Sequence, residues 1–148
     1  MIRMLLCDDD EVILEGICEC IDWQSYDIEL IAAVNNGKKA MQILEQESPD
    51  LILTDIRMPY YTGLDIAWAA KQKSADIIVV ILSGYNDFEY ARKAIKMGVL
   101  DFISKPIDLD ELDHVLRKVT EQWKNQQYSR HRDMRDGFAR LINRAGEA

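Results

Sequence analysis

Residues 77–82, Ile-Ile-Val-Val-Ile-Leu, form the longest unbroken apolar run of the chain. A short run of mostly β-branched residues is typical of a strand that is covered on both faces, as in the middle of a parallel sheet. Four other short apolar runs have the same character, at residues 2–7, 28–34, 51–54 and 100–104. Segments with apolar residues at helical spacing follow the five runs, at residues 11–20, 38–47, 63–71, 87–97 and 108–123. This alternation predicts an α/β fold, a flavodoxin-like, doubly wound five-stranded parallel sheet with strand order 2-1-3-4-5.

Polar side chains follow four of the predicted strands at their carboxyl ends. Three aspartates come after the first strand, and single polar residues end the third, fourth and fifth: Asp8, Asp9 and Asp10, then Asp55, Ser83 and Lys105. Because the carboxyl ends of parallel strands lie at one edge of a sheet, we expect these side chains to share one site. Clustered carboxylates repel one another unless a cation neutralises them, and Mg²⁺ binds carboxylates, a backbone carbonyl and water.

An aspartate beside such a cation is a competent nucleophile toward phosphorus. The charge of the resulting aspartyl phosphate calls for a metal, a cationic side chain and a hydroxyl, and Lys105 and Ser83 supply the last two. Each residue by itself has an ordinary interpretation, as an acid at a helix N-terminus, a surface lysine or a turn serine. Their convergence at one edge favours a functional site, and the residues predict phosphoryl transfer to Asp55.

The composition argues against several classes of protein. No apolar run approaches the roughly 20 residues that a membrane-spanning helix needs, and the first residues do not resemble a signal peptide. The net charge of −8 argues against direct nucleic-acid binding by this chain, although residues 128–148 carry five arginines against three acids. Cys7, Cys18 and Cys20 lack zinc-type spacing, and we expect free thiols in a reducing cytoplasm.

Four separated motifs resemble the receiver domain of two-component response regulators: Cys7-Asp8-Asp9-Asp10, Thr54-Asp55-Ile56-Arg57-Met58-Pro59, Leu82-Ser83-Gly84 and Lys105-Pro106. The resemblance implies that Asp55 is the phosphoacceptor, with a sensor histidine kinase as donor and Mg²⁺ as cofactor. It implies four metal ligands: Asp9 directly, Asp8 through water, Asp55, and the backbone carbonyl of Arg57. It also implies that Lys105 and Ser83 stabilise the phosphoryl group and that the Lys105–Pro106 peptide bond is cis.

The same resemblance implies a switch rather than an enzyme, since a receiver catalyses only its own phosphorylation and dephosphorylation. Ser83 is expected to move toward the phosphoryl group and Phe102 to follow inward. That movement would remodel the surface of the fourth helix, fifth strand and fifth helix. The chain departs from the family pattern at two positions. Cys7 stands where an aliphatic residue is usual, with an effect expected on packing alone. Phe102 replaces the commoner tyrosine, so a hydroxyl contact is lost.

Two further runs, Ile21-Asp22-Trp23 and residues 83–91, resemble receivers that precede an AraC-type helix-turn-helix DNA-binding domain in transcriptional regulators. We therefore expect residues 1–124 to form a receiver and residues 125–148 a helical linker toward an output domain beyond this chain.

The linker leaves two interpretations open. Four apolar residues of the linker fall on one face of a helix: Met134, Phe138, Leu141 and Ile142. This apolar face favours a homodimer through the linker helix. A homodimer through the surface of the fourth helix, fifth strand and fifth helix is the alternative. Gln126, Gln127 and Arg130 interrupt the apolar pattern, which favours instead a linker that frays without its output domain.

Other functions are less compatible with these residues. A phosphatase of the haloacid dehalogenase kind also uses an aspartate on a parallel sheet, but Arg57 stands where its second aspartate would be. A flavin-binding module of the same fold would need a phosphate-binding loop after the first strand, where three aspartates stand. A phosphorylation-independent interaction module would not require the complete set of site residues.

Overall fold

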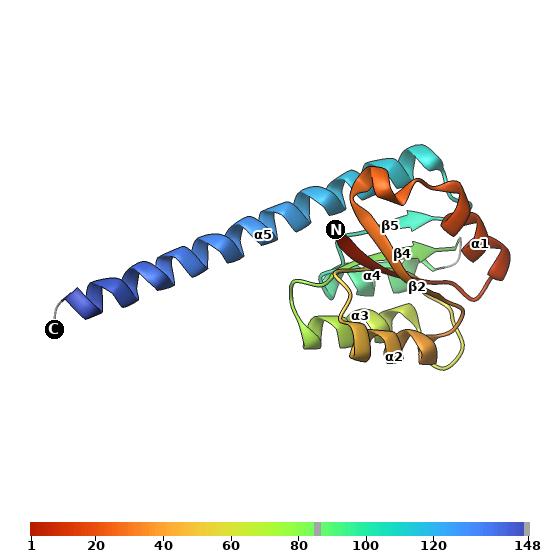
Figure 1. The fold of residues 1–148 in the computed structure, drawn as a ribbon. Helices are drawn as coiled ribbons and strands as arrows, with labels where there is room; N and C mark the ends of the chain where they lie inside the picture. The colour runs from red at the N-terminus through yellow and green to blue at the C-terminus, as the bar shows by residue number, and fades with distance from the viewer. Residues whose placement is uncertain (85–86, 147–148) are drawn as a thin grey trace.

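The computed structural model describes residues 1–84 and 87–146. Five parallel strands form one sheet in the order β2-β1-β3-β4-β5. The strands are β1 (Ile2–Cys7), β2 (Ile28–Val34), β3 (Leu51–Asp55), β4 (Ile78–Ser83) and β5 (Asp101–Ser104). The helices are α1 (Glu11–Cys20), the 3₁₀ helix η1 (Trp23–Tyr26), α2 (Gly37–Glu47), α3 (Gly63–Lys73), α4 (Phe88–Lys96) and α5 (Leu109–Gly146). The predicted flavodoxin-like fold and its strand order are confirmed (Figure 1).

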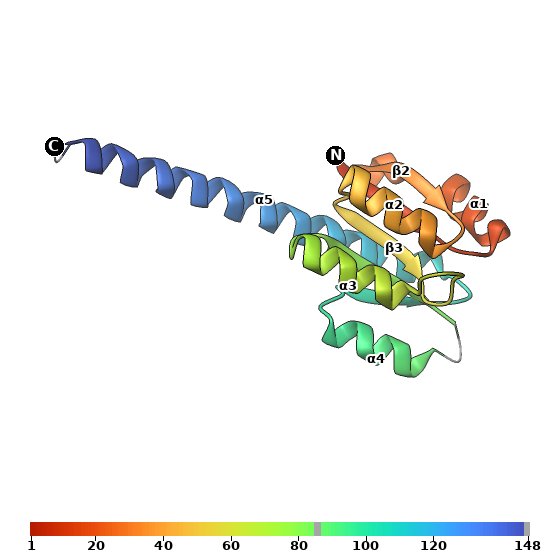
Figure 2. The same ribbon diagram turned by 90° about the horizontal axis from the view of Figure 1, so that it is seen from below.

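Helices cover both faces of the sheet, which is why β3 and β4 are buried along their whole length. One apolar cluster lies under α1, η1 and α5, and the other lies under α2, α3 and α4 (Figures 1 and 2). Side chains alternate between the two clusters along β1, β3 and β4, as the pleat of a strand requires. In β1, Met4 and Leu6 enter the first cluster, and Leu5 and Cys7 enter the second. Burial raises the pKa of the Cys7 thiol to about 12, so this cysteine acts as a neutral packing group.

Strand register brings the polar ends of the strands to the same edge. Asp55 lies opposite Leu82, one residue before Ser83, and Ser83 lies opposite Ser104, one residue before Lys105. The backbone amide of Lys105 donates to the carbonyl of Ser83 at 2.8 Å. The loops that leave this edge are held by local hydrogen bonds, such as the Asp10 side chain, which caps α1.

Helix α5 is one uninterrupted helix of 38 residues, and its second half projects away from the sheet (Figures 1 and 2). Gln126 and Gln127 interrupt the apolar face of the helix, as the sequence indicated, but they do not break the helix, because glutamine is a good helix former. Leu112, Leu116 and Val119 bury the first half against the sheet. In the described part of the second half, Arg130 forms an ion pair of 2.6 Å with Asp76 of the α3–β4 loop. None of the described helices is long and apolar enough to cross a membrane.

Candidate functional site: an acidic cluster at the strand ends

Three aspartates meet at the carboxyl end of the sheet, as the sequence predicted. Asp8, Asp9 and Asp55 each place one carboxylate oxygen within 4.8 Å of the others. Asp8 is fully buried and Asp55 is 6 % exposed, whereas Asp9 is exposed to solvent. Asp10, the fourth acid of the predicted site region, points away and caps α1. The cluster is therefore a half-buried acidic hollow with one solvent-facing carboxylate.

Lys105 lies against the two buried acids of this cluster. Its ammonium Nζ donates to Asp55 Oδ2 at 3.0 Å and lies 2.9 Å from Asp8 Oδ2. Burial alone would lower the pKa of the Lys105 ammonium, but the contacts with Asp8 and Asp55 outweigh it and raise that pKa. Lys105 is therefore a permanent cation at the site. The Lys105–Pro106 bond that follows it is cis.

Asp55 is held in position by backbone groups as well as by Lys105. Its Oδ1 accepts a hydrogen bond from the amide of Ile56 at 2.8 Å, and its carbonyl accepts one from the Thr54 hydroxyl at 2.9 Å. Burial raises the pKa of the Asp55 carboxyl from 3.8 to about 6, with the nearby Asp8 adding to the rise and Lys105 opposing it. The carboxylate is thus oriented, and most of its population is ionised at neutral pH.

The residues of the cluster fit a hard divalent cation. Asp8 Oδ2 is buried and, despite its ionic contact with Lys105, takes part in no hydrogen bond among the described residues. A buried carboxylate oxygen with a spare lone pair is costly unless a cation completes its coordination. Asp8, Asp9 and Asp55 together carry three negative charges, and Lys105 neutralises one of them. The three carboxylates form a donor set that suits Mg²⁺. The Arg57 carbonyl as a further ligand stays a prediction.

Ser83 and Phe102 lie beside the acidic cluster and do not contact it directly. Ser83 is buried, yet its hydroxyl forms no hydrogen bond with Asp55. Both residues line a cavity of about 260 Å³ between α4 and β5, which Lys105 also lines. Phe102 is half-buried and packs against the core beneath α2, α3 and α4. The two predicted switch residues therefore share one space that leaves room for movement.

The sequence interpretation missed one ion pair at the border of the site. Arg57 Nε donates to Asp87 Oδ1 at 2.7 Å, and Asp87 is 5 % exposed. The family resemblance assigns a role to the backbone carbonyl of Arg57, and the helical spacing places Asp87 at the start of a helix. No local pattern indicates this pair, because it joins two different loops.

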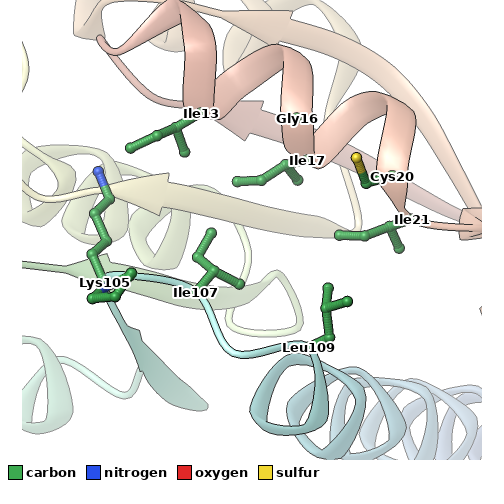
Figure 3. Close-up of a pocket in the computed structure, with 9 residues that line it drawn as sticks. Ile13, Gly16, Ile17, Cys20, Ile21, Lys105, Ile107 and Leu109 are labelled. Carbon is green, nitrogen blue, oxygen red and sulfur yellow. The ribbon is translucent and has the colours of Figure 1, made fainter.

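An apolar pocket of about 280 Å³ opens next to Lys105, between α1 and the β5–α5 loop. Figure 3 shows Ile13 and Ile17 pointing from α1 toward Ile107 and Leu109, with Lys105 at one end. The Leu109 side chain is 65 % exposed, so this part of the pocket is open to solvent. The acidic cluster therefore has an apolar surface adjoining it.

The raised pKa of Asp55 predicts a pH dependence of folding. Between pH 3.8 and about 6 the folded protein holds a proton on Asp55 that the unfolded chain has released. The Asp55 contribution to stability is therefore complete below pH 3.8 and falls as pH rises to 6, by about 3 kcal/mol in total. The measurement is the free energy of urea unfolding of wild type and of Asp55→Asn at each pH, in the presence of a chelator. If the two proteins keep a constant difference from pH 4 to 7, the buried carboxylate is not the cause.

Residues 4–117 match the family described as response regulator receiver domain. Among curated proteins, the transcriptional regulatory protein HptR of Staphylococcus aureus is 34 % identical over 145 residues, covering 96 % of this chain and 57 % of HptR. An uncharacterized response regulatory protein of Staphylococcus epidermidis is 33 % identical over 133 residues, covering 90 % of this chain and 52 % of its own length. The chain thus spans about half the length of these curated relatives.

Two solved structures show the same fold. One is the receiver domain of AraT, a response regulator from Geobacillus stearothermophilus. It has a TM-score of 0.81 and 32 % identity, and the match covers 85 % of this chain and 98 % of the solved receiver-domain chain. A two-component transcriptional regulator AraC from Clostridium phytofermentans has a TM-score of 0.79 and 30 % identity, over 86 % of this chain and 98 % of its own. Tyr85 and Asn86, part of the run that resembles AraC-type receivers, lie outside the described residues.

Proposed function

The chain belongs to the response regulator receiver family, and from this membership we propose that Asp55 accepts a phosphoryl group from the phosphohistidine of a sensor histidine kinase. The observation that carries the proposal is the contact of Lys105 with both buried aspartates beside the exposed Asp9. This arrangement pairs a nucleophile with a fixed cation and an acidic metal site.

The transfer requires little movement of the residues at the site. A carboxylate oxygen of Asp55 attacks phosphorus, an acyl phosphate bond forms, and the bond from phosphorus to the histidine nitrogen breaks, leaving a neutral or protonated imidazole. The Ile56 amide orients the Asp55 carboxylate for this attack. Lys105 lies where it can contact the added phosphoryl oxygens. Asp9, Asp55 and the Arg57 carbonyl, with Asp8 through water, would hold Mg²⁺, which would neutralise the charge of the phosphoryl group. Ser83 and Phe102 respond to the phosphoryl group through their shared cavity.

The output is proposed to be transcriptional. We assign residues 1–124 to the receiver and residues 125–148 to a helical linker toward an AraC-type helix-turn-helix domain that binds DNA. HptR is a transcriptional regulatory protein and the Clostridium phytofermentans relative is a two-component transcriptional regulator AraC, and both similarities support this output. The three free cysteines support the cytoplasmic location that the sequence suggested. No contact with nucleic acid is proposed for this chain itself.

Exposed apolar side chains support contacts with other proteins after switching. Phe88 and Ile95 on α4 are 70 % and 54 % exposed, and four residues of the second half of α5 are 54–75 % exposed: Met134, Phe138, Leu141 and Ile142. The first group suits a surface that changes with phosphorylation, and the second suits a homodimer through the linker helix.

The direct test is phosphorylation of the purified protein by acetyl phosphate. With Mg²⁺ the intact mass is expected to rise by one phosphoryl group, about 80 Da, on the peptide that contains Asp55. Chelation of the metal is expected to suppress the rise. A protein that stays unlabelled with Mg²⁺, while a known receiver is labelled in the same buffer, would contradict the proposal.

The apolar pocket gives a test of the kinase as donor. The kinase must bring its phosphohistidine to the rim that holds Lys105, so its surface meets Leu109 and Ile107 beside that rim. Leu109→Arg is expected to slow phosphotransfer from the partner kinase about tenfold, the effect of losing a modest contact of about 1.4 kcal/mol. Labelling by acetyl phosphate should stay unchanged, because this small donor needs no docking surface.

Leu141→Arg is the matched control for that experiment, since Leu141 is 64 % exposed on the distant half of α5. The expected result is normal phosphotransfer from the kinase. Equal phosphotransfer by the Leu109 and Leu141 variants would place the kinase contact elsewhere.

A further inference from the structure

An ion pair outside the acidic cluster joins the loop after Asp55 to the first turn of α4. Arg57 Nε donates to Asp87 Oδ1 at 2.7 Å, and the guanidinium carbon of Arg57 lies 5.7 Å from the centre of the Tyr90 ring. We propose, on the basis of the proposed function of Asp55, that the Arg57–Asp87 pair is a latch that holds Gly84 and Asp87 in their unphosphorylated positions. Arg57 and Asp87 are then positioning residues of the switch.

The second oxygen of Asp87 extends the latch to the backbone beside the switch hydroxyl. The amide of Gly84 donates to Asp87 Oδ2 at 2.8 Å, and the amide of Asp87 donates back to the Gly84 carbonyl at 3.2 Å. Gly84 directly follows Ser83, whose hydroxyl does not reach Asp55 in this state. In the proposed switch the Ser83–Gly84 segment moves toward Asp55. The Asp87 carboxylate holds that segment to Arg57 and so opposes the movement.

Asp87 has an alternative set of partners within α4. It occupies the N-cap position, where an aspartate side chain ordinarily accepts hydrogen bonds from the first amides of the helix, but here it forms no such bond. Both of its oxygens serve Arg57 and Gly84 instead. Neither Asp87 oxygen is shared with an amide of the first turn of α4 in this structure. Release from Arg57 therefore frees Asp87 to cap α4, so Asp87 has two alternative sets of partners.

In this proposal, the negative charge that phosphorylation adds at Asp55 triggers the release of Arg57 from Asp87. A phosphoryl group carries about two negative charges, and Arg57 lies two residues after the residue that receives it. The Arg57 side chain is 64 % exposed, so its guanidinium is free to turn, whereas Asp87 is buried and stays with the loop. The new anion competes with Asp87 for Arg57, and the latch weakens when Asp55 is phosphorylated.

The test uses Arg57→Gln, Asp87→Asn and the double variant. Arg57→Gln keeps the backbone carbonyl proposed as a metal ligand, and Asp87→Asn keeps an oxygen for the Gly84 amide, so at least one single variant is expected to fold. Each is expected to bind the phosphoryl mimic beryllofluoride, with Mg²⁺, about three- to tenfold more tightly than wild type by calorimetry. The double variant should bind no more tightly than the tighter single variant, because both substitutions remove the same interaction.

Amide hydrogen exchange of residues 87–91 gives a second readout that needs no phosphoryl chemistry. Exchange of the first α4 amides in the free protein is expected to be slower in Arg57→Gln than in wild type, because Asp87 is then free to cap the helix. Glu47→Gln is the control, since it removes a 2.8 Å ion pair with Arg3 at the opposite end of the sheet. It should change neither beryllofluoride affinity nor exchange at residues 87–91.

The outcomes separate the latch from the proposed function. A wild-type protein that binds no beryllofluoride and accepts no phosphoryl group overturns the proposed function, and the role of the latch with it. In the second case, the wild-type protein binds beryllofluoride, and the Arg57 and Asp87 variants match Glu47→Gln in affinity and in exchange. That result overturns the latch alone. Weaker binding by these variants also overturns it, because the pair would then support the phosphorylated arrangement.

Discussion

Asp55→Asn is expected to take up no phosphoryl group from acetyl phosphate or from a phosphorylated kinase. The carboxamide of asparagine is a poor nucleophile and cannot form an acyl phosphate. Asp55 is also the carboxylate that Lys105 and the Ile56 amide hold in a fixed orientation, so no neighbouring acid is placed to replace it. Intact-mass spectrometry with Mg²⁺ should show the full mass increase in the wild type and none in the variant.

Asp10→Asn is the matched control for this loss. Asp10 belongs to the same run of acids, but it is exposed and caps α1, and asparagine caps a helix equally well. The Asp10 variant is therefore expected to be labelled like the wild type. Labelling of Asp55→Asn to the wild-type extent, or recovery of the phosphoryl group on the peptide of Asp8 and Asp9, would show that the phosphoacceptor is a different residue.

Gly63→Ala is expected to cost the largest amount of stability among single-methyl changes next to the site. A Cβ atom at position 63 would lie 2.3 Å from the carbonyl oxygen of Asp55 and 3.0 Å from the Cα of Ile56. Both are backbone atoms, so no side chain can turn away to relieve the contact. The Gly63 amide also donates to the Ile56 carbonyl at 2.7 Å, which fixes the approach of α3 to β3. We expect a loss of about 3 kcal/mol or more in urea unfolding.

Gly16→Ala is the control for Gly63→Ala, because nothing lies within 4 Å of a Cβ at position 16. Gly16 is inside α1, where alanine is a better helix former, so this variant is expected to gain up to about 1 kcal/mol. A Gly63→Ala protein within about 0.5 kcal/mol of the wild type would mean that the β3–α3 loop yields more easily than its backbone contacts indicate.

The positions of the main site residues were predictable from the sequence for a clear reason. The apolar runs and the helical spacing between them indicate a parallel α/β sheet, and in such a sheet the ends of the strands meet at one edge. The predicted fold therefore makes Asp8, Asp55 and Lys105 neighbours. In the structure the Lys105 ammonium lies 2.9 Å from Asp8 Oδ2 and 3.0 Å from Asp55 Oδ2. The motif resemblance named the same residues independently.

The sequence was less informative where a local pattern weakens or where two loops meet. It correctly indicated helical character after residue 125, but the apolar face alone did not show that α5 continues without a break from Leu109 to Gly146. Backbone helix formation depends on residue propensity as well as on apolar spacing, and the residues near Gln126 favour a helix.

By itself, then, the sequence determined the alternation of strands and helices and which polar residues stand at the strand ends, because both follow from short-range apolar periodicity. The strand order 2-1-3-4-5 was predicted as one of two common orders for such a sheet, and the structure confirmed it. Only the tertiary structure decided that Asp8 is fully buried against Lys105, that Arg57 is paired with Asp87, and that Gly63 has no room for a side chain. Each of these depends on distances of a few ångströms between atoms of separate loops and strands. Such distances are set by the packing of the whole domain, and no pattern within one segment encodes them.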